Sequence, residues 1–258
     1  MSIGDYDWSL IWDNRDALLG GLWTAAAVAV VALLISVVCG LLLAVLRAAP
    51  RPLNWIALAY INIFRGVPAL VSVIWVYFGL ALLLNIKFSV FQAGVIALSL
   101  LYSAFFAEIF RSALQAVPPG HREAGWALGM RSSQIFFSVT LPQALKIAFP
   151  NIGSMFIGMV KDTSTFTVIG LLEVVRVTQN LVATTFQPFV LYTAAAIIYV
   201  LAAFAIDLVF RLIEGAYVRP PLGILGRLLR TRQQRQIESI VDRVKAGELA
   251  TSSVPSLH

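Results

Sequence analysis

Two adjacent ionisable residues, Lys161 and Asp162, lie inside an otherwise apolar stretch, 147–172, and are followed by the hydroxyl residues Thr163 and Ser164. A charge at the centre of a bilayer costs about 2.5–3.5 kcal/mol on insertion scales, so ionisable groups at membrane depth are functional candidates. Two opposite charges side by side lessen this cost. Neighbouring side chains on a helix point about 100° apart, so we expect each of the two to have a separate partner.

The composition of the chain indicates that these residues sit in a membrane protein. Of the 258 residues, 59% are hydrophobic and 12% are charged, and the mean hydropathy is +0.85. A water-soluble domain of this length does not carry so much apolar surface. A spanning helix needs about 20 apolar residues. Five runs of that order predict five spans, at about 20–46, 66–86, 88–110, 147–172 and 177–210.

Charge predicts the orientation of these spans, because cytoplasmic loops are rich in lysine and arginine. With the N-terminus outside, 15 of the 19 basic residues lie on the cytoplasmic side. Only Arg15, Lys87 and Arg176 then lie outside, and Lys161 lies within a span. An odd number of spans places the C-terminus in the cytoplasm. The net charge of +6 is therefore attributed to inner loops facing anionic lipid, not to nucleic-acid binding.

A polar island of small residues, 123–129, interrupts the apolar pattern. Glu123, Ala124, Gly125 and Gly129 are followed twelve residues later by Leu141, and then by Pro142. Glutamate in the first turns of a short helix complements the helix dipole, and Gly129 suits a left-handed helix end. Small side chains let the helix backbone approach a partner closely. A surface turn that only joins two membrane helices is the alternative interpretation.

This island resembles the EAA loop of bacterial ABC importer permeases, in which Glu-Ala-Ala precedes Gly and a distant Leu-Pro. Val139 takes the place of the usual isoleucine, and Gly125 departs from the usual alanine. The resemblance implies an all-α integral membrane protein with the five-helix type I ABC importer permease (MetI-like) fold. It also implies that the loop couples to an ATPase through Glu123, Ala124, Gly125, Gly129, Leu141 and Pro142.

Three further segments resemble the polar amino acid subfamily of these permeases. Phe64-Arg65-Gly66-Val67-Pro68 has valine where threonine is usual, and Ala104-Phe105-Phe106-Ala107-Glu108 has Phe105 where tyrosine is usual. The stretch from Lys161 has Thr165 where leucine is usual. The resemblance implies a polar amino acid as substrate. Another small zwitterion, such as an opine or an ectoine-like solute, stays open.

The resemblance makes several residues candidates for the substrate path or its gating: Arg65, Glu108, Lys161, Asp162, Thr163 and Ser164. Each has a structural alternative. Arg65 can reach cytoplasmic phosphates as a membrane anchor. Glu108 and Arg111 are three residues apart and can form a structural ion pair. Lys161 and Asp162 can lock two permease subunits together, and Gly153 and Gly158 invite close helix packing nearby.

The sequence predicts no catalytic, cofactor-binding or metal site on this chain. The segment from Gly153 to Gly158 lacks the lysine and hydroxyl of a phosphate loop, so ATP and magnesium are expected on a separate ATPase. Cys39 is the single cysteine, and His121 and His258 lie far apart. The expected partners are a cytoplasmic ATPase dimer, a second permease chain (identical or different), an extracytoplasmic substrate-binding protein, lipid and a small polar amino acid.

The expected organisation is an outer lead-in at 1–19 with Trp8 and Trp12 suited to the membrane interface, a permease domain at 20–218 and a basic tail at 219–258. The coupling loop is expected at 112–146, in the cytoplasm. These features predict a multi-pass protein of the bacterial inner membrane that is a transporter subunit rather than an enzyme. An ion-coupled secondary carrier and a membrane-embedded enzyme are the rival classes, although no inverted repeat or cluster of catalytic groups supports them.

Overall fold

The computed structural model describes residues 6–218, and within that range every regular element is a helix. Residues up to Leu212 form one compact unit, and a second unit begins at Ile213. The predicted basic tail lies outside the described residues. The elements are α1 (Ser9–Asp13), α2 (Arg15–Arg47), α3 (Leu53–Gly66), α4 (Ala69–Ile74), a π-helix (Trp75–Leu80), α5 (Ala81–Leu84), α6 (Val90–Ala116), α7 (Pro119–Ala127), α8 (Ser132–Ile135), a π-helix (Phe136–Thr140), α9 (Leu141–Asp162), a 3₁₀ helix (Thr163–Ile169), α10 (Val174–Thr185), α11 (Pro188–Ile213) and a π-helix (Glu214–Val218).

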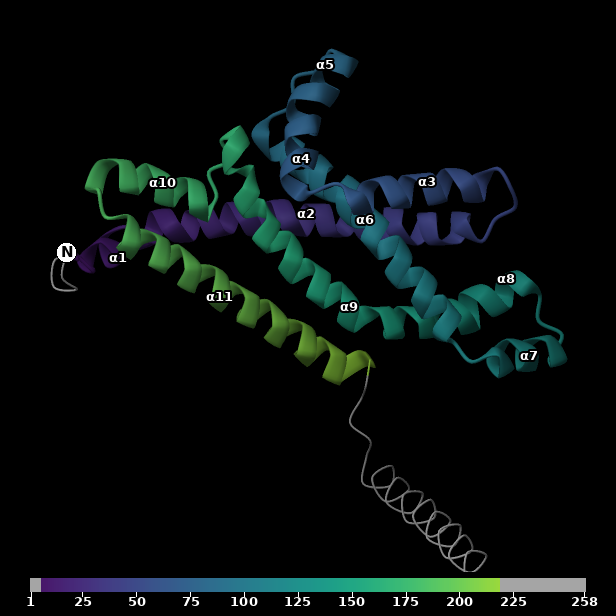
Figure 1. Cartoon of the computed structure of the whole chain (residues 1–258). Helices are drawn as coiled ribbons and strands as arrows, with labels where there is room; N and C mark the ends of the chain where they lie inside the picture. The colour runs from purple at the N-terminus through teal and green to yellow at the C-terminus, as the bar shows by residue number, and fades with distance from the viewer. Residues whose placement is uncertain (1–5, 219–258) are drawn as a thin grey trace, which may run out of the picture. The chain divides into compact units, whose positions relative to one another are not determined.

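Helices α2 and α6 form the centre of this unit (Figure 1). The 33 residues of α2 extend about 50 Å, which exceeds the roughly 30 Å of a bilayer's hydrocarbon core. Small residues at spacings of three and four form the buried stripe of α2 and let α6 approach closely. This stripe contains Ala25, Ala29, Ala32, Ser36, Gly40 and Ala44.

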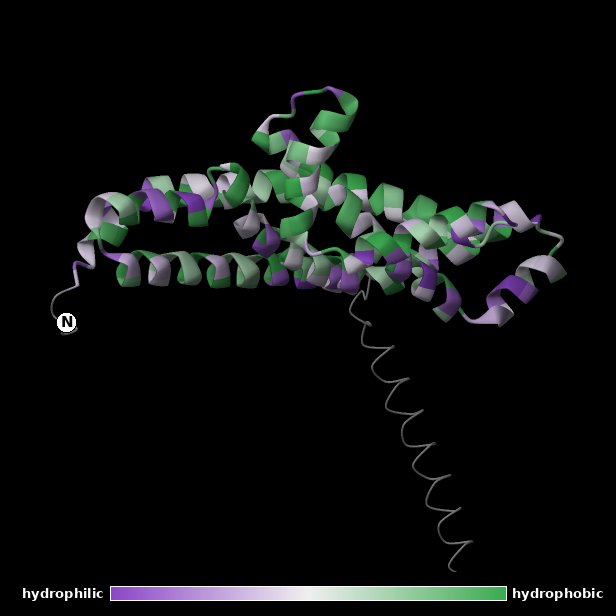
Figure 2. Ribbon diagram, turned by 45° about the horizontal axis from the view of Figure 1, so that its top comes forward, coloured by the Kyte–Doolittle hydropathy of each residue, from purple (hydrophilic) through white to green (hydrophobic). Residues whose placement is uncertain are grey.

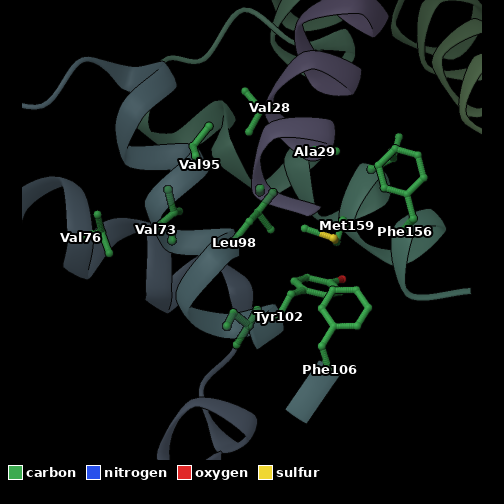
Figure 3. Close-up of a cluster of buried hydrophobic side chains, with 14 of the residues drawn as sticks. Val28, Ala29, Val73, Val76, Val95, Leu98, Tyr102, Phe106, Phe156 and Met159 are labelled. Carbon is green, nitrogen blue, oxygen red and sulfur yellow. The ribbon is translucent and has the colours of Figure 1, made fainter. Parts of the chain in front are cut away.

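The buried core lies where α2, α4, α6 and α9 meet. Figure 3 shows Val28 and Ala29 of α2 facing Leu98 of α6, with Met159 and Phe156 of α9 beside them. Aliphatic and aromatic side chains fill this region, so van der Waals contact holds these helices together.

Four described helices are long and apolar enough to span a membrane, and counting one bent pair as a span makes up to five. The bent pair joins Leu53–Gly66 to Ala69–Leu84 at 109°. Pro68 causes the bend, because a proline forces the preceding residue out of the helical region, and Val67 is extended at φ −92° and ψ 128°. Tyr60 ties α3 to α6 by donating to the Leu100 carbonyl at 2.9 Å.

The uninterrupted fifth span predicted at 177–210 is divided in the structure. Helix α10 ends at Thr185, and α11 begins at Pro188. Phe186 between them is left-handed, with φ of 54°, and Pro188 lacks an N–H with which to continue α10. The sequence prediction overlooked that α10 has a polar side, which includes Arg176, Gln179 and Asn180.

Hydropathy follows this division of the elements. In Figure 2 the long helices are mostly hydrophobic, whereas the short helix α7 is largely hydrophilic. The predicted fourth span begins earlier than expected, since α9 starts at Leu141, and its C-terminal part is the 3₁₀ helix Thr163–Ile169.

Candidate functional site

The short helix α7 is built from local signals at both ends. Pro118 is extended and Pro119 occupies the first helical turn, where a missing N–H costs nothing. At the other end, Gly129 has a φ of 73°. Its N–H donates to the Trp126 carbonyl at 2.9 Å, and the Met130 N–H donates to the Gly125 carbonyl at 3.0 Å. These two bonds form a Schellman motif, which confirms the predicted left-handed stop at Gly129.

Gly125 is the buried residue of α7, and its surroundings explain why alanine is absent there. A Cβ at this position would lie 2.8 Å from Cγ1 of Ile135, a distance that real Cβ atoms do not show. The missing methyl group lets α7 close onto α8. The departure from the usual loop sequence is therefore matched by a bulky residue ten positions later.

Large apolar side chains on the other side of this loop are exposed on the protein surface. Leu128 is 80% exposed, and Trp126 and Phe137 are also exposed. Glu123 and Ala124 share the exposed surface. Large apolar residues exposed on a rigid polar loop are typical of a protein contact surface. We call Glu123, Ala124, Trp126, Leu128 and Phe137 the α7 surface.

A cavity of about 410 Å³ lies beneath the α7 surface. Ala48 after α2, Gln115 of α6, Arg122 and Trp126 of α7 and Thr140 are among the residues that line it. The remaining loop residues named from the sequence, Leu141 and Pro142, begin α9 immediately after a π-helical turn. Leu141 is half-buried and Pro142 is exposed, so Pro142 continues the outer surface of the loop.

Glu108 binds two arginine side chains near the C-terminal end of α6. It accepts a hydrogen bond from Nη1 of Arg47 at 2.5 Å, and its other oxygen pairs with Arg111. Arg111 also donates to Oε1 of Gln115 at 2.6 Å. The predicted pair of Glu108 and Arg111 is thus confirmed, and Arg47 is an additional partner that connects α2 to the helix preceding the α7 surface.

Arg65 lies at the end of α3, within electrostatic range of the Glu108 carboxylate. Its guanidinium lies 5.8 Å from the ring centroid of Phe105, within the range of a cation–π contact. Phe105 is the residue that stands where tyrosine is usual, and the ring supplies this contact without a hydroxyl.

The four polar residues 161–164, which end α9 and begin the 3₁₀ helix, do not converge on one point. Tyr102 of α6 donates to Oδ2 of Asp162 at 2.9 Å. The buried hydroxyl of Thr163 donates a hydrogen bond to the Val160 carbonyl at 2.7 Å. Ser164 is half-buried, whereas Lys161 is exposed. Asp162 and Lys161 therefore face different neighbours, as their adjacency predicts.

Lys161 lines a cavity of about 500 Å³ between α9 and α11. Tyr199, Phe204, Asp207 and Arg211 of α11 line it with Lys161. Arg211 donates to Asp207 at 2.7 Å. The cavity is mainly apolar and carries two cations and one carboxylate. We call it the α9–α11 cavity.

Glu173 is a buried carboxylate whose position the sequence did not reveal. It is fully buried and accepts the backbone N–H groups of Val175 and Arg176 at 2.7 Å each. The hydroxyl of Tyr199 donates to it at 2.8 Å. Burial raises the pKa of Glu173, and these three donors oppose that rise. The carboxylate caps α10 and fixes it to α11.

This geometry defines a multi-span helical membrane protein. It has a polar loop that carries a short helix, and a cavity between helices that is lined by ionisable side chains. Residues 36–219 match the family described as "Binding-protein-dependent transport system inner membrane component". The chain belongs to this family.

Curated relatives support that membership along most of the chain. The glutamine transport system permease protein GlnP of Escherichia coli is 33% identical over 211 residues, which cover 81% of this chain and 96% of GlnP. The L-cystine transport system permease protein TcyB of Bacillus subtilis is 33% identical, covering 80% of this chain and 89% of TcyB. These relatives are membrane permeases, as is this chain.

Solved structures agree with the fold. A crystal structure described as an amino acid ABC transporter with histidines superposes with a TM-score of 0.76 at 31% identity, covering 83% of this chain and 99% of the other. An inward-facing structure of the MetNI methionine ABC transporter gives a TM-score of 0.69 at 23% identity, covering 79% and 97%. The second likeness concerns the fold alone.

Proposed function

We propose that this chain is the permease subunit of an ATP-driven importer for polar amino acids and that the α7 surface couples it to a cytoplasmic ATPase. The observation that carries the proposal is the form of this surface. A nine-residue helix, fixed at both ends by proline and a Schellman motif, exposes Trp126 and Leu128. Membership of the binding-protein-dependent family and the amino acid permeases among the relatives support the proposal.

In this proposal two permease chains enclose the path and two ATPase subunits bind below them. ATP-driven closure of the ATPases moves both α7 surfaces, and rocking of the helices switches access between the two sides. The ion pair of Arg47 and Glu108 transmits this motion, because it joins α2 to α6, and α6 leads into the α7 surface. Differential binding to two conformers carries the mechanism, and the chain performs no covalent chemistry.

The proposal requires the α7 surface to face the cytoplasm, with the N-terminus outside. In a Cys39→Ala background, a cysteine placed at Trp126 is expected to react with a membrane-impermeant maleimide only after the cells are opened. A cysteine at Lys87, between α5 and α6, should react with intact cells and serves as the matched control. Labelling of position 126 in intact cells would refute the orientation and the coupling role together.

Function is tested by reconstituting the permease with its ATPase and binding protein in proteoliposomes. Uptake of a labelled polar amino acid is expected only with ATP and with all components present. Uptake that continues without the ATPase would instead favour an ion-coupled secondary carrier. Competition by unlabelled glutamine, arginine, cystine and ectoine then separates the amino acids from other zwitterions.

We further propose that Lys161 in the α9–α11 cavity holds the substrate carboxylate. A hydrogen bond to a charged group contributes about 1.5–3 kcal/mol, so Lys161→Ala should lower uptake roughly 10- to 100-fold. Lys161→Arg should retain most uptake, because it keeps the charge. The matched control is Lys146→Ala, which removes another exposed cation of α9. Equal uptake by Lys161→Ala and Lys146→Ala would exclude this role.

A further inference from the structure

Aromatic residues lie at α1 and the residues before it, and at the turn between α10 and α11. The ring of Phe189, at the start of α11, lies 4.9 Å from that of Tyr6 and 6.1 Å from that of Trp8. Figure 1 shows α1 and the turn between α10 and α11 at the same end of the compact unit. Trp8, Phe186 and Phe189 are exposed, as is Trp12 of α1. We call Tyr6, Trp8, Trp12, Phe186 and Phe189 the aromatic patch.

Phe186 is held in a backbone conformation that disfavours its side chain. It caps the C-terminal end of α10 with φ of 54°, a position that glycine or asparagine normally occupies. A bulky residue with positive φ is a conformational outlier. The ring is 82% exposed, so burial within this chain does not compensate for the strain. Strain of this kind concentrates at functional sites.

The start of α10, at the other end of the helix from Phe186, is fixed in place. Glu173 anchors the first turn of α10 and binds Tyr199 of α11. At Gly21 of α2, a Cβ would lie 2.9 Å from the backbone of Glu173 and Val174. These contacts with α2 and α11 orient α10, the 12-residue helix that carries Phe186 at its C-terminal end, and a pre-oriented helix loses less entropy on binding a partner.

Carboxylates alternate with the aromatic residues at the start of the described chain. Asp7, Asp13 and Asp16 are exposed there, near Tyr6, Trp8 and Trp12 in sequence. The one basic residue of α1 and the start of α2 is Arg15, whose guanidinium lies 5.2 Å from the ring centroid of Trp12. The patch therefore combines apolar rings with a negative rim, which complements a partner that carries basic residues around an apolar centre.

The position of Trp23 favours a protein over lipid as the partner of the aromatic patch. Trp23 is 76% exposed on α2, and exposed tryptophans on membrane helices anchor at the interface. Arg15, the first residue of α2, lies eight positions earlier, about 12 Å further along the axis. Figure 1 shows α1 beyond the N-terminal end of α2, so in the proposed orientation the aromatic patch lies further from the membrane centre than Trp23.

We propose that the aromatic patch is a docking surface for the extracytoplasmic substrate-binding protein, which meets it with a basic surface. This inference rests on the proposed function and its orientation, and it names the contact that the binding protein makes on this chain. Phe186 inserts into the partner, and the aspartates steer it electrostatically.

The test uses the complete transporter in lipid nanodiscs and the purified binding protein that stimulates the wild-type ATPase. Phe186→Gly should raise the binding-protein concentration needed for half-maximal stimulation about tenfold. The same variant should unfold at the wild-type temperature or above, because glycine relieves the strain of positive φ. Asp7→Asn with Asp13→Asn should raise that concentration mainly at low salt, where charge steering acts.

The matched control is Trp55→Ala, which removes an exposed aromatic residue from α3 and should leave stimulation unchanged. Wild-type stimulation by Phe186→Gly would overturn the docking role while the proposed function stands. Unchanged stimulation with weaker membrane insertion would assign the patch to lipid headgroups and likewise overturn it. A wild-type complex that no binding protein stimulates would overturn the proposed function and the docking surface together.

Discussion

Gly125→Val is expected to reduce ATP-driven uptake about 10- to 100-fold while leaving the permease in the membrane. The added Cβ would lie 2.8 Å from Cγ1 of Ile135, and the branched side chain needs still more room. Overpacking of this kind costs about 1–3 kcal/mol, which corresponds to that range of fold-changes. The α7 surface would separate from α8 and lose its fixed position. Uptake and ATPase activity of the reconstituted transporter measure the effect.

A second substitution distinguishes packing from a general defect. Ile135→Ala removes the colliding side chain, so Gly125→Val with Ile135→Ala should regain much of the lost uptake. Gly120→Val is the matched control, because nothing lies within 4 Å of a Cβ at Gly120 in the same helix. Normal uptake by Gly125→Val, or a double variant as impaired as the single one, would contradict the role given to this contact.

Features that depend on local sequence could be predicted. The apolar runs predicted a multi-span helical protein because the bilayer requires long apolar helices. Gly129 could be assigned as a helix end because a left-handed cap favours glycine regardless of what surrounds it. Gly153 could be linked to close packing, and a Cβ there would lie 2.7 Å from Cδ1 of Phe210.

Features that depend on contacts between distant segments could not be predicted from the sequence. Arg47 and Glu108 are 61 residues apart, and nothing in either segment indicates the pairing. The division between α10 and α11 was missed because a count of uncharged residues ignores the polar side of α10. The burial of Glu173 could not be predicted, since it depends on Gly21 and Tyr199 from two other helices.

The substrate-path candidates show the same limit. Lys161 and Asp162 could be identified as costly residues at membrane depth. That they serve different neighbours followed from helix geometry, but their particular neighbours did not. Asp207 and Arg211 gained significance only when the structure placed them across the cavity from Lys161.

Gly40→Leu is expected to prevent the permease from folding. A Cβ on Gly40 would lie 2.5 Å from Cβ of Phe106, and 3.0 Å from both the amide nitrogen of Ala107 and the carbonyl oxygen of Ser103. Two of these atoms belong to the backbone of α6, which cannot rotate away as a side chain can. The helices α2 and α6 would have to separate along their whole contact, and this contact holds the centre of the compact unit.

Graded substitutions at Gly40 measure this effect. Gly40→Ala should destabilise the detergent-solubilised permease by about 1–3 kcal/mol, seen as a melting temperature lower by roughly 2–12 °C. Gly40→Leu should yield no monodisperse protein on size-exclusion chromatography. Gly20→Leu is the control on the same helix, because a Cβ at Gly20 has nothing within 4 Å.

Phe106→Ala offers the decisive comparison. It removes the Phe106 ring but leaves its Cβ and the backbone atoms of Ser103 and Ala107 in place, so Gly40→Leu with Phe106→Ala should stay unfolded. Recovery of folded protein in that double variant would show that side chains, and not the backbone of α6, set the distance between the two helices. We therefore expect Ile135→Ala to restore function to Gly125→Val, because a side chain causes that clash. We expect Phe106→Ala not to restore folding to Gly40→Leu, because the backbone of α6 causes that one.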